Sequence, residues 1–180
     1  MELASSWDFR FLDTEQDRQT LLADMRRVRR AVVELAEGLP GDRVYAPRYH
    51  GWSPAAMLAH LHFTDNISLI AVKLALLGLQ PKVSKASWNR VNNITTRVFQ
   101  RRLLATTITE IKANEARIGE FILQVPLERF TRTFYYPPAE KQLTVEQALQ
   151  VLFLFHWQEH RQTIERTEGV YYEPPGANAG

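Results

Sequence analysis

The sequence predicts an all-α fold, a four-helix bundle with one extra short helix. Three observations support this prediction. Long segments carry apolar residues every three or four positions, which is the period of an amphipathic helix. Glycine and proline stand where these segments end, and favourable N-cap residues stand where two of them begin. Four substantial helices with one apolar stripe each bury those stripes best against one another, as in a bundle.

The first two helices are predicted over residues 14–37 and 53–77. The first has a regular apolar stripe, made of Leu21, Leu22, Met25, Val28, Val32, Leu35 and Ala36. Gly38, Pro40 and Gly41 then end it. The second begins at Ser53-Pro54, because serine is a strong N-cap and proline suits the first helical position. Gly78 and Pro81 follow its end.

The second half of the chain predicts three more helices. A short one covers about residues 86–104, and a longer one covers about 107–124, where isoleucines recur on one face. Residues 130–136 alternate loosely and predict a short extended piece. The last helix is predicted over 144–167, because Thr-Val-Glu-Gln at its start matches a capping box.

Length and composition indicate one globular domain. We expect the bundle to cover residues 1–172 and the Pro/Gly/Ala-rich residues 173–180 to form a flexible tail. The chain has no cysteine, which excludes disulfides, cysteine-ligated metals and a cysteine nucleophile. We find neither a signal peptide nor an uninterrupted apolar run of about 18 residues, so we expect a cytoplasmic protein with no membrane partner. The net charge of +2 does not by itself indicate nucleic-acid binding.

The five histidines fall in two short segments, residues 50–62 and 156–160. His156 and His160 are four residues apart on the last helix, so they share one face and continue its apolar stripe. His60 lies on the apolar stripe of the second helix, whereas His62 is about 200° round that helix and faces elsewhere. Three inward histidines with an open fourth position are typical of a catalytic zinc site. Spacing alone leaves open the alternative that they are hydrogen-bonded core residues.

Two segments resemble motifs of the DinB/YfiT-like superfamily of metal-dependent enzymes. Trp-Ser-Pro at residues 52–54, followed by Leu-Ala-His-Leu at 58–61, is similar to the start of the family's second helix. His-Trp-Gln-Glu-His-Arg at residues 156–161 is similar to its closing H-x-x-x-H-R motif. One departure is Thr163, where relatives often carry glutamine. This difference leaves the three ligands unchanged but puts in doubt a contact that supports them or packs the helix.

The resemblance implies a bundle that holds one divalent metal, zinc or nickel, through His60, His156 and His160. It also implies a thiol-dependent transferase or isomerase that combines a small-molecule electrophile with bacillithiol, mycothiol or glutathione. Since the chain has no cysteine, the thiol would come from a cosubstrate. A metal-dependent hydrolase is the alternative activity. Many relatives are dimers, so we expect a homodimer.

No residue is clearly placed as the general base. Glu159 is the nearest carboxylate in sequence, about 60° round the helix from His156, and a solvated or supporting acid is the simpler interpretation of it. His50, in the loop before the second helix, is a candidate substrate contact. Asp65 is a weaker candidate base. Trp52 and Trp157 are expected to pack.

Three competing interpretations remain. Residues 156–160 also match H-x-x-E-H of inverzincin proteases, but only Glu165, Glu168 and Glu173 follow as acidic ligands. The arginines at residues 26–30, with Arg101 and Arg102, could bind nucleic acid, although a bundle helix needs such a polar face anyway. The third possibility is a non-catalytic bundle that binds metal or a partner through the same histidines.

Overall fold

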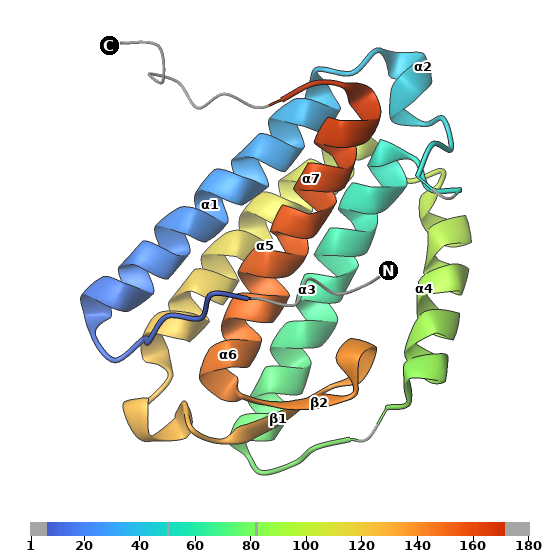
Figure 1. The fold of residues 1–180 in the computed structure, drawn as a ribbon. Helices are drawn as coiled ribbons and strands as arrows, with labels where there is room; N and C mark the ends of the chain where they lie inside the picture. The colour runs from blue at the N-terminus through green and yellow to red at the C-terminus, as the bar shows by residue number, and fades with distance from the viewer. Residues whose placement is uncertain (1–6, 50, 82, 172–180) are drawn as a thin grey trace, which may run out of the picture.

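The computed structural model describes residues 7–49, 51–81 and 83–171. Within these residues the fold is a helical bundle with one small β-hairpin (Figure 1). The helices of the bundle are α1 (Glu15–Glu37), α3 (Pro54–Leu76), α4 (Lys85–Phe99), α5 (Leu104–Gln124), α6 (Val145–Gln150) and α7 (His156–Glu168). The connecting segments contain the short helix α2 (Gly41–Val44) and the strands β1 (Thr133–Tyr136) and β2 (Lys141–Thr144). The predicted all-α four-helix bundle is confirmed.

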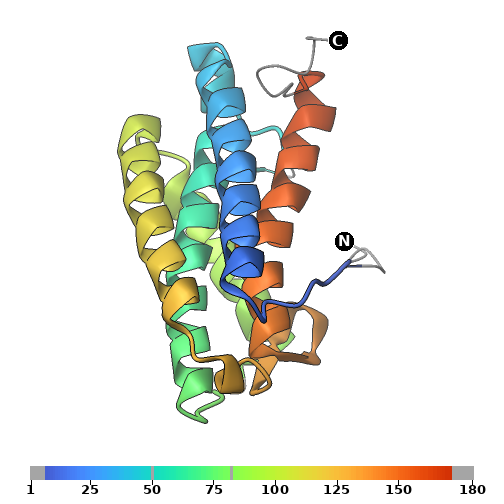
Figure 2. The ribbon, with the colours of Figure 1, turned by 90° about the vertical axis from the view of Figure 1, so that its left-hand side faces the viewer.

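The four core helices of the bundle are α1, α3, α5 and the α6–α7 segment, and they do not simply alternate in direction. α1 packs on α5 and on α7, while α3 packs on α5 and on α4 (Figures 1 and 2). α4 carries the chain back along the outside of α3, so α5 runs in the same direction as α3 (Figure 1). This return leaves α3 in the middle, between α4 and α7 in that view.

The predicted helix starts are confirmed by the cap hydrogen bonds. Thr14 precedes α1 and forms a capping box with Asp17. The Ser53 side chain accepts from the Ala56 N–H at the start of α3, and Thr144 forms the predicted capping box with Gln147. Each cap satisfies backbone N–H groups that the first turn leaves free, so these boundaries follow from a few adjacent residues.

Four details of the fold differ from the sequence prediction. The short helix ends at Phe99 rather than near 104, and a four-residue helix, α2, follows the end of α1. The extended piece is one strand of an antiparallel hairpin, β1 paired with β2, whose second strand the polar segment 141–144 did not indicate. The last helix is interrupted by a π-helical turn over Val151–Phe155, between α6 and α7. Pairing partners and a widened turn depend on contacts that no local pattern records.

α3 is long and apolar enough, by length and composition alone, to cross a membrane. However, 67% of its most apolar window is buried inside the bundle. Its apolar residues contact other helices, with Leu58 and Leu61 fully buried, as in the central helix of a globular core. The predicted 173–180 tail falls outside the described residues.

Candidate metal centre

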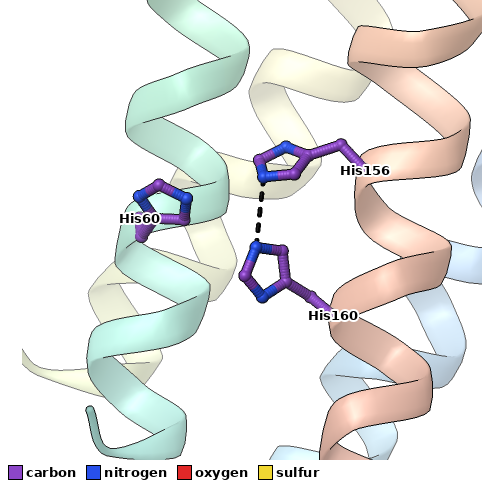
Figure 3. Close-up of side chains that lie close together, drawn as sticks. All are labelled: His60, His156 and His160. Carbon is purple, nitrogen blue, oxygen red and sulfur yellow. Dashed lines mark hydrogen bonds between the residues drawn. The ribbon is translucent and has the colours of Figure 1, made fainter. Parts of the chain in front are cut away.

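Three histidines from two helices lie together between α3 and α7. His60 comes from α3, while His156 and His160 come from successive turns of α7 (Figure 3). The ring centroids of His60 lie 5.5 Å from His156 and 5.4 Å from His160. One ligand nitrogen from each residue lies within 4.8 Å of the others. The three side chains singled out by the sequence are therefore brought to one place.

Burial keeps these imidazoles neutral. Burial, with a smaller contribution from the neighbouring His160, lowers the pKa of His60 to about 3. Burial also lowers the pKa of His160 to about 4 and that of His156 well below its usual value. His60 is only 5% exposed, whereas His156 and His160 are partly exposed. At neutral pH each ring is therefore neutral and keeps a nitrogen lone pair, which a metal ion requires.

The spacing of the nitrogens suits one metal ion. Two imidazole nitrogens on one tetrahedral zinc, each about 2.0–2.1 Å from it, lie about 3.3 Å apart. Nε2 of His156 and Nε2 of His160 lie 3.1 Å apart. Nδ1 of His60 is buried and has no hydrogen-bond partner among the described residues. A buried, unpaired nitrogen is costly, and coordination at this atom would remove that cost.

The π-helical turn sets the direction of His156 and His160. The His156 N–H bonds to the Val151 carbonyl, one residue further back than in an α-helix. Within this wider turn the Phe153 carbonyl accepts a hydrogen bond from Nη1 of Arg29 on α1 at 2.8 Å. A side chain of α1 thus stabilises the irregular turn that orients α7.

Arg29 belongs to a buried polar network behind the histidines. Its guanidinium forms an ion pair with Asp65 of α3 at 3.0 Å and lies 4.6 Å from the centre of the Trp157 ring. Trp157 Nε1 donates to the other oxygen of Asp65 at 3.1 Å. Arg29 and Asp65 are 1% and 2% exposed, and Trp157 is fully buried. The network connects α1, α3 and α7 directly, so it fixes the helices that carry the histidines.

The family comparison agrees with this architecture. A model of the DinB superfamily matches residues 24–164, more than half of the chain. The chain belongs to the DinB superfamily. Among solved structures, it resembles YfiT from Bacillus subtilis, a probable metal-dependent hydrolase with an unusual four-helix bundle topology. The TM-score is 0.68 at 19% identity, covering 92% of this chain and 95% of YfiT. No curated protein matches the sequence significantly.

In this DinB protein Glu159 lies on α7 between the two histidines. Its side chain is partly buried, and burial raises the pKa of the carboxyl. The phenol pKa of Tyr136, on β1, is raised mainly by burial. The negative charge of the nearby Glu159 raises it further. The Glu159 carboxylate is therefore a stronger base than the carboxylate of a solvated glutamate.

The other sequence-predicted residues take different positions. His50 falls outside the described residues. His62 points to the α5 side, where Nε2 lies 3.1 Å from the Asn66 amide and 3.4 Å from Glu110. The Asp65 carboxylate is engaged by Arg29 and Trp157, so it is not free to act as a base. The Thr163 hydroxyl donates to the Glu159 carbonyl at 2.9 Å.

The alternatives considered for the arginines and for the acids near the C-terminus lose support. Arg29 is buried in the core and not on a surface patch, which corrects the interpretation of the 26–30 run as one polar face. The Glu168 side chain is buried, where it accepts from the Tyr49 hydroxyl and pairs with Arg48, each at 2.7 Å. Glu165 pairs with Arg161 at 2.8 Å. The nearby acids expected of an inverzincin are therefore engaged elsewhere.

Two further residues lie near the centre, and neither was expected to contact the histidines. Trp52 places its ring edge-on to His60, with centroids 4.6 Å apart, and so limits the motion of that imidazole. Tyr136 reaches the site from the hairpin, which is distant in sequence from both histidine segments. The Trp-Ser-Pro motif could have indicated the first contact, but only pairing of β1 with β2 places the second.

Proposed function

We propose that this DinB protein is a divalent-metal-dependent hydrolase of a small molecule. The observation that carries the proposal is the cluster of three neutral histidines whose ligand nitrogens lie within 4.8 Å of one another. His60, His156 and His160 would hold the ion, and three protein ligands leave a coordination position open for reaction. When bound, a divalent ion in such a site lowers the pKa of water and polarises a carbonyl or phosphoryl oxygen.

The chain's own residues supply positioning and proton transfer. Trp52 and the Arg29–Asp65–Trp157 network hold the three imidazoles in place. Glu159 would accept the proton released during hydrolysis, because burial raises its pKa. The Tyr136 hydroxyl, whose pKa is affected by the charge of Glu159, would orient a polar atom of the substrate.

The thiol-transfer activity implied by the family resemblance stays a competing prediction. It needs the same ion but a thiol cosubstrate in place of water. YfiT, a probable metal-dependent hydrolase, is the relative that favours hydrolysis. The three alternatives differ in what the metal-loaded protein consumes: a hydrolase consumes substrate and water, a transferase consumes substrate and thiol, and a non-catalytic metal site consumes neither. The homodimer and the cytoplasmic location likewise stay predictions.

Metal content is the first test. Untagged protein, purified and then incubated with zinc or nickel, should contain about one equivalent by elemental mass spectrometry, as a single mononuclear site requires. His60→Ala and His156→Ala should each lose that metal. His62→Ala is the matched control, because it removes a histidine of the same helix that points away, and it should keep the metal. Equal metal in all four proteins would refute the shared site.

Activity separates the remaining possibilities. The loaded protein should hydrolyse members of a panel of esters, amides and phosphoesters without added thiol, and His156→Ala should not. Turnover only with bacillithiol, mycothiol or glutathione would instead establish the transferase. No turnover of either panel, with one tightly held equivalent of metal, would favour the non-catalytic bundle.

A further inference from the structure

An apolar cavity lies between α3, α4 and the hairpin. Its volume is about 270 Å³. Ile67 and Ala71 of α3 form one side, and Trp88 of α4 forms another. Tyr136 and Pro137 from the hairpin close its end, and Leu152 from the π-helical turn contributes as well. The α4 return and the hairpin, neither of which belongs to the four-helix core, are what create this cavity.

The cavity and the histidine cluster both lie along α3. On α3, Thr64 and Ser68 follow His60 at intervals of four residues, so the three lie on one face, and Ser68 lines the cavity. At 1.5 Å per residue, Ser68 lies about 12 Å along the helix from His60. Leu152 is about one turn before His156. Tyr136 lines the cavity and is close enough to Glu159 for the charge of that carboxylate to affect its pKa. A ligand that spans about 12 Å along α3 would therefore reach from the histidines to the cavity.

The lining indicates what the cavity would accept. None of the described side chains that line it carries a charge. The polar group of Gln80 is already engaged, since its amide donates to the Thr133 carbonyl at 2.7 Å. An ionised group would lose its hydration there without gaining a partner. The volume exceeds the roughly 150 Å³ that accommodates benzene, and it is at the small end of ligand pockets.

We propose that this cavity binds an uncharged apolar group of the substrate, an aromatic ring or a branched alkyl chain, whose reacting end lies at the three histidines. The proposal rests on the proposed function for the reacting end. It assigns the substrate class: a molecule with a hydrolysable polar head separated from an apolar tail by about two helical turns of length. Ile67, Ala71 and Leu152 would determine which tails fit.

Hydroxamates test head and tail separately, because the hydroxamate group binds metal ions and the tail can be varied. Calorimetry on the zinc-loaded protein should show 6-phenylhexanohydroxamate binding at least about tenfold more tightly than acetohydroxamate. Ala71→Trp, which fills the cavity from a partly exposed position, should abolish that gain and leave acetohydroxamate binding unchanged. Ala113→Trp on the exposed face of α5 is the matched control and should keep the gain. Ile67→Trp replaces Ala71→Trp if that variant does not fold.

An equal gain in the filled variant, or no gain in the parent protein, would overturn the proposal. Failure of acetohydroxamate to bind in a zinc-dependent manner would instead refute the metal site. In that case indole added to zinc-free protein still decides the cavity: it should shift the methyl resonances of Ile67 and Leu152, and unchanged resonances would overturn the proposal. A dimer in sedimentation that Ala71→Trp dissociates would assign the cavity to a second copy of the chain, and would also overturn it.

Discussion

Replacing Arg29 by methionine should destabilise the protein far more than the same replacement two residues earlier. Arg29 is 1% exposed and pairs with Asp65, which is 2% exposed. Arg27 forms a comparable contact, 2.7 Å from Asp24, but its side chain is 61% exposed. Methionine keeps much of the volume of arginine and removes the charge. The two variants therefore differ in the burial of the ion pair that is broken.

The magnitude follows from what remains after the change. At 3.0 Å, with an effective dielectric constant of about 20, the attraction between Arg29 and Asp65 is about 5 kcal/mol. The cost of removing both ions from water is of the same order, so the intact pair contributes little net stability. Arg29→Met leaves Asp65 buried without its partner and should cost about 3–5 kcal/mol. Arg27→Met should cost less than about 1 kcal/mol.

Urea unfolding followed by far-UV circular dichroism measures both values. For a chain of this size, the Arg29→Met loss corresponds to a melting temperature lower by roughly 6–20 °C. The double variant Arg29→Met/Asp65→Leu should recover at least half of the loss, because no unpaired charge stays buried. A single-variant loss below about 1 kcal/mol would refute the reasoning. A double variant as unstable as the single one would assign the loss to the Phe153 carbonyl and not to charge.

Three further predictions concern titration, catalysis and folding. Metal-free protein should lose stability as the pH falls from 6.5 to 5, because the unfolded chain binds protons near pH 6.5, whereas burial holds the pKa of His60 at about 3. The contribution of His60 to this loss should reach about 2 kcal/mol at pH 5. Urea unfolding of His60→Asn at the same pH values should lack this contribution. Identical pH profiles of stability for the parent protein and His60→Asn would contradict the assignment. Glu159→Gln should lower kcat about 10²–10⁴-fold at unchanged metal content, and an unaltered kcat in steady-state assays would exclude it as the proton acceptor. Thr144→Ala removes the capping box and should lower the free energy of unfolding by about 1 kcal/mol, measured by thermal unfolding. An unchanged stability would instead show that Gln147 alone supports the helix start.

Signals that act over a few residues predicted the helices well. Ser53 and Thr144 cap the helices that they were expected to cap, and Thr14 caps the first helix at its predicted start, because each side chain bonds a backbone N–H three residues away. The four-residue spacing of His156 and His160 likewise survives the π-helical turn, since both residues lie beyond it in regular α7. Local geometry is independent of the rest of the chain in these cases.

Other features depend on partners distant in sequence. Arg29 has the sequence context of a surface arginine, yet it is buried because Asp65 and the Phe153 carbonyl lie opposite it. The strand 141–144 has a polar sequence and becomes a strand through pairing with β1. The same physics decides the position of the short helix α4, which packs on α3 along the outside of the bundle while its Val91, Ile94 and Val98 side chains stay exposed. In each case a long-range contact outweighs a weak local preference.

The sequence alone determined the helix starts, the bundle class and the three histidines on two predicted helix faces, because caps and apolar periods are local properties of the chain. Only the tertiary structure decided that His60 meets His156 and His160, since nothing in the spacing fixes which faces of α3 and α7 oppose each other. It alone placed Tyr136 beside Glu159 and formed the apolar cavity, because both require the hairpin and α4 to fold back onto α3.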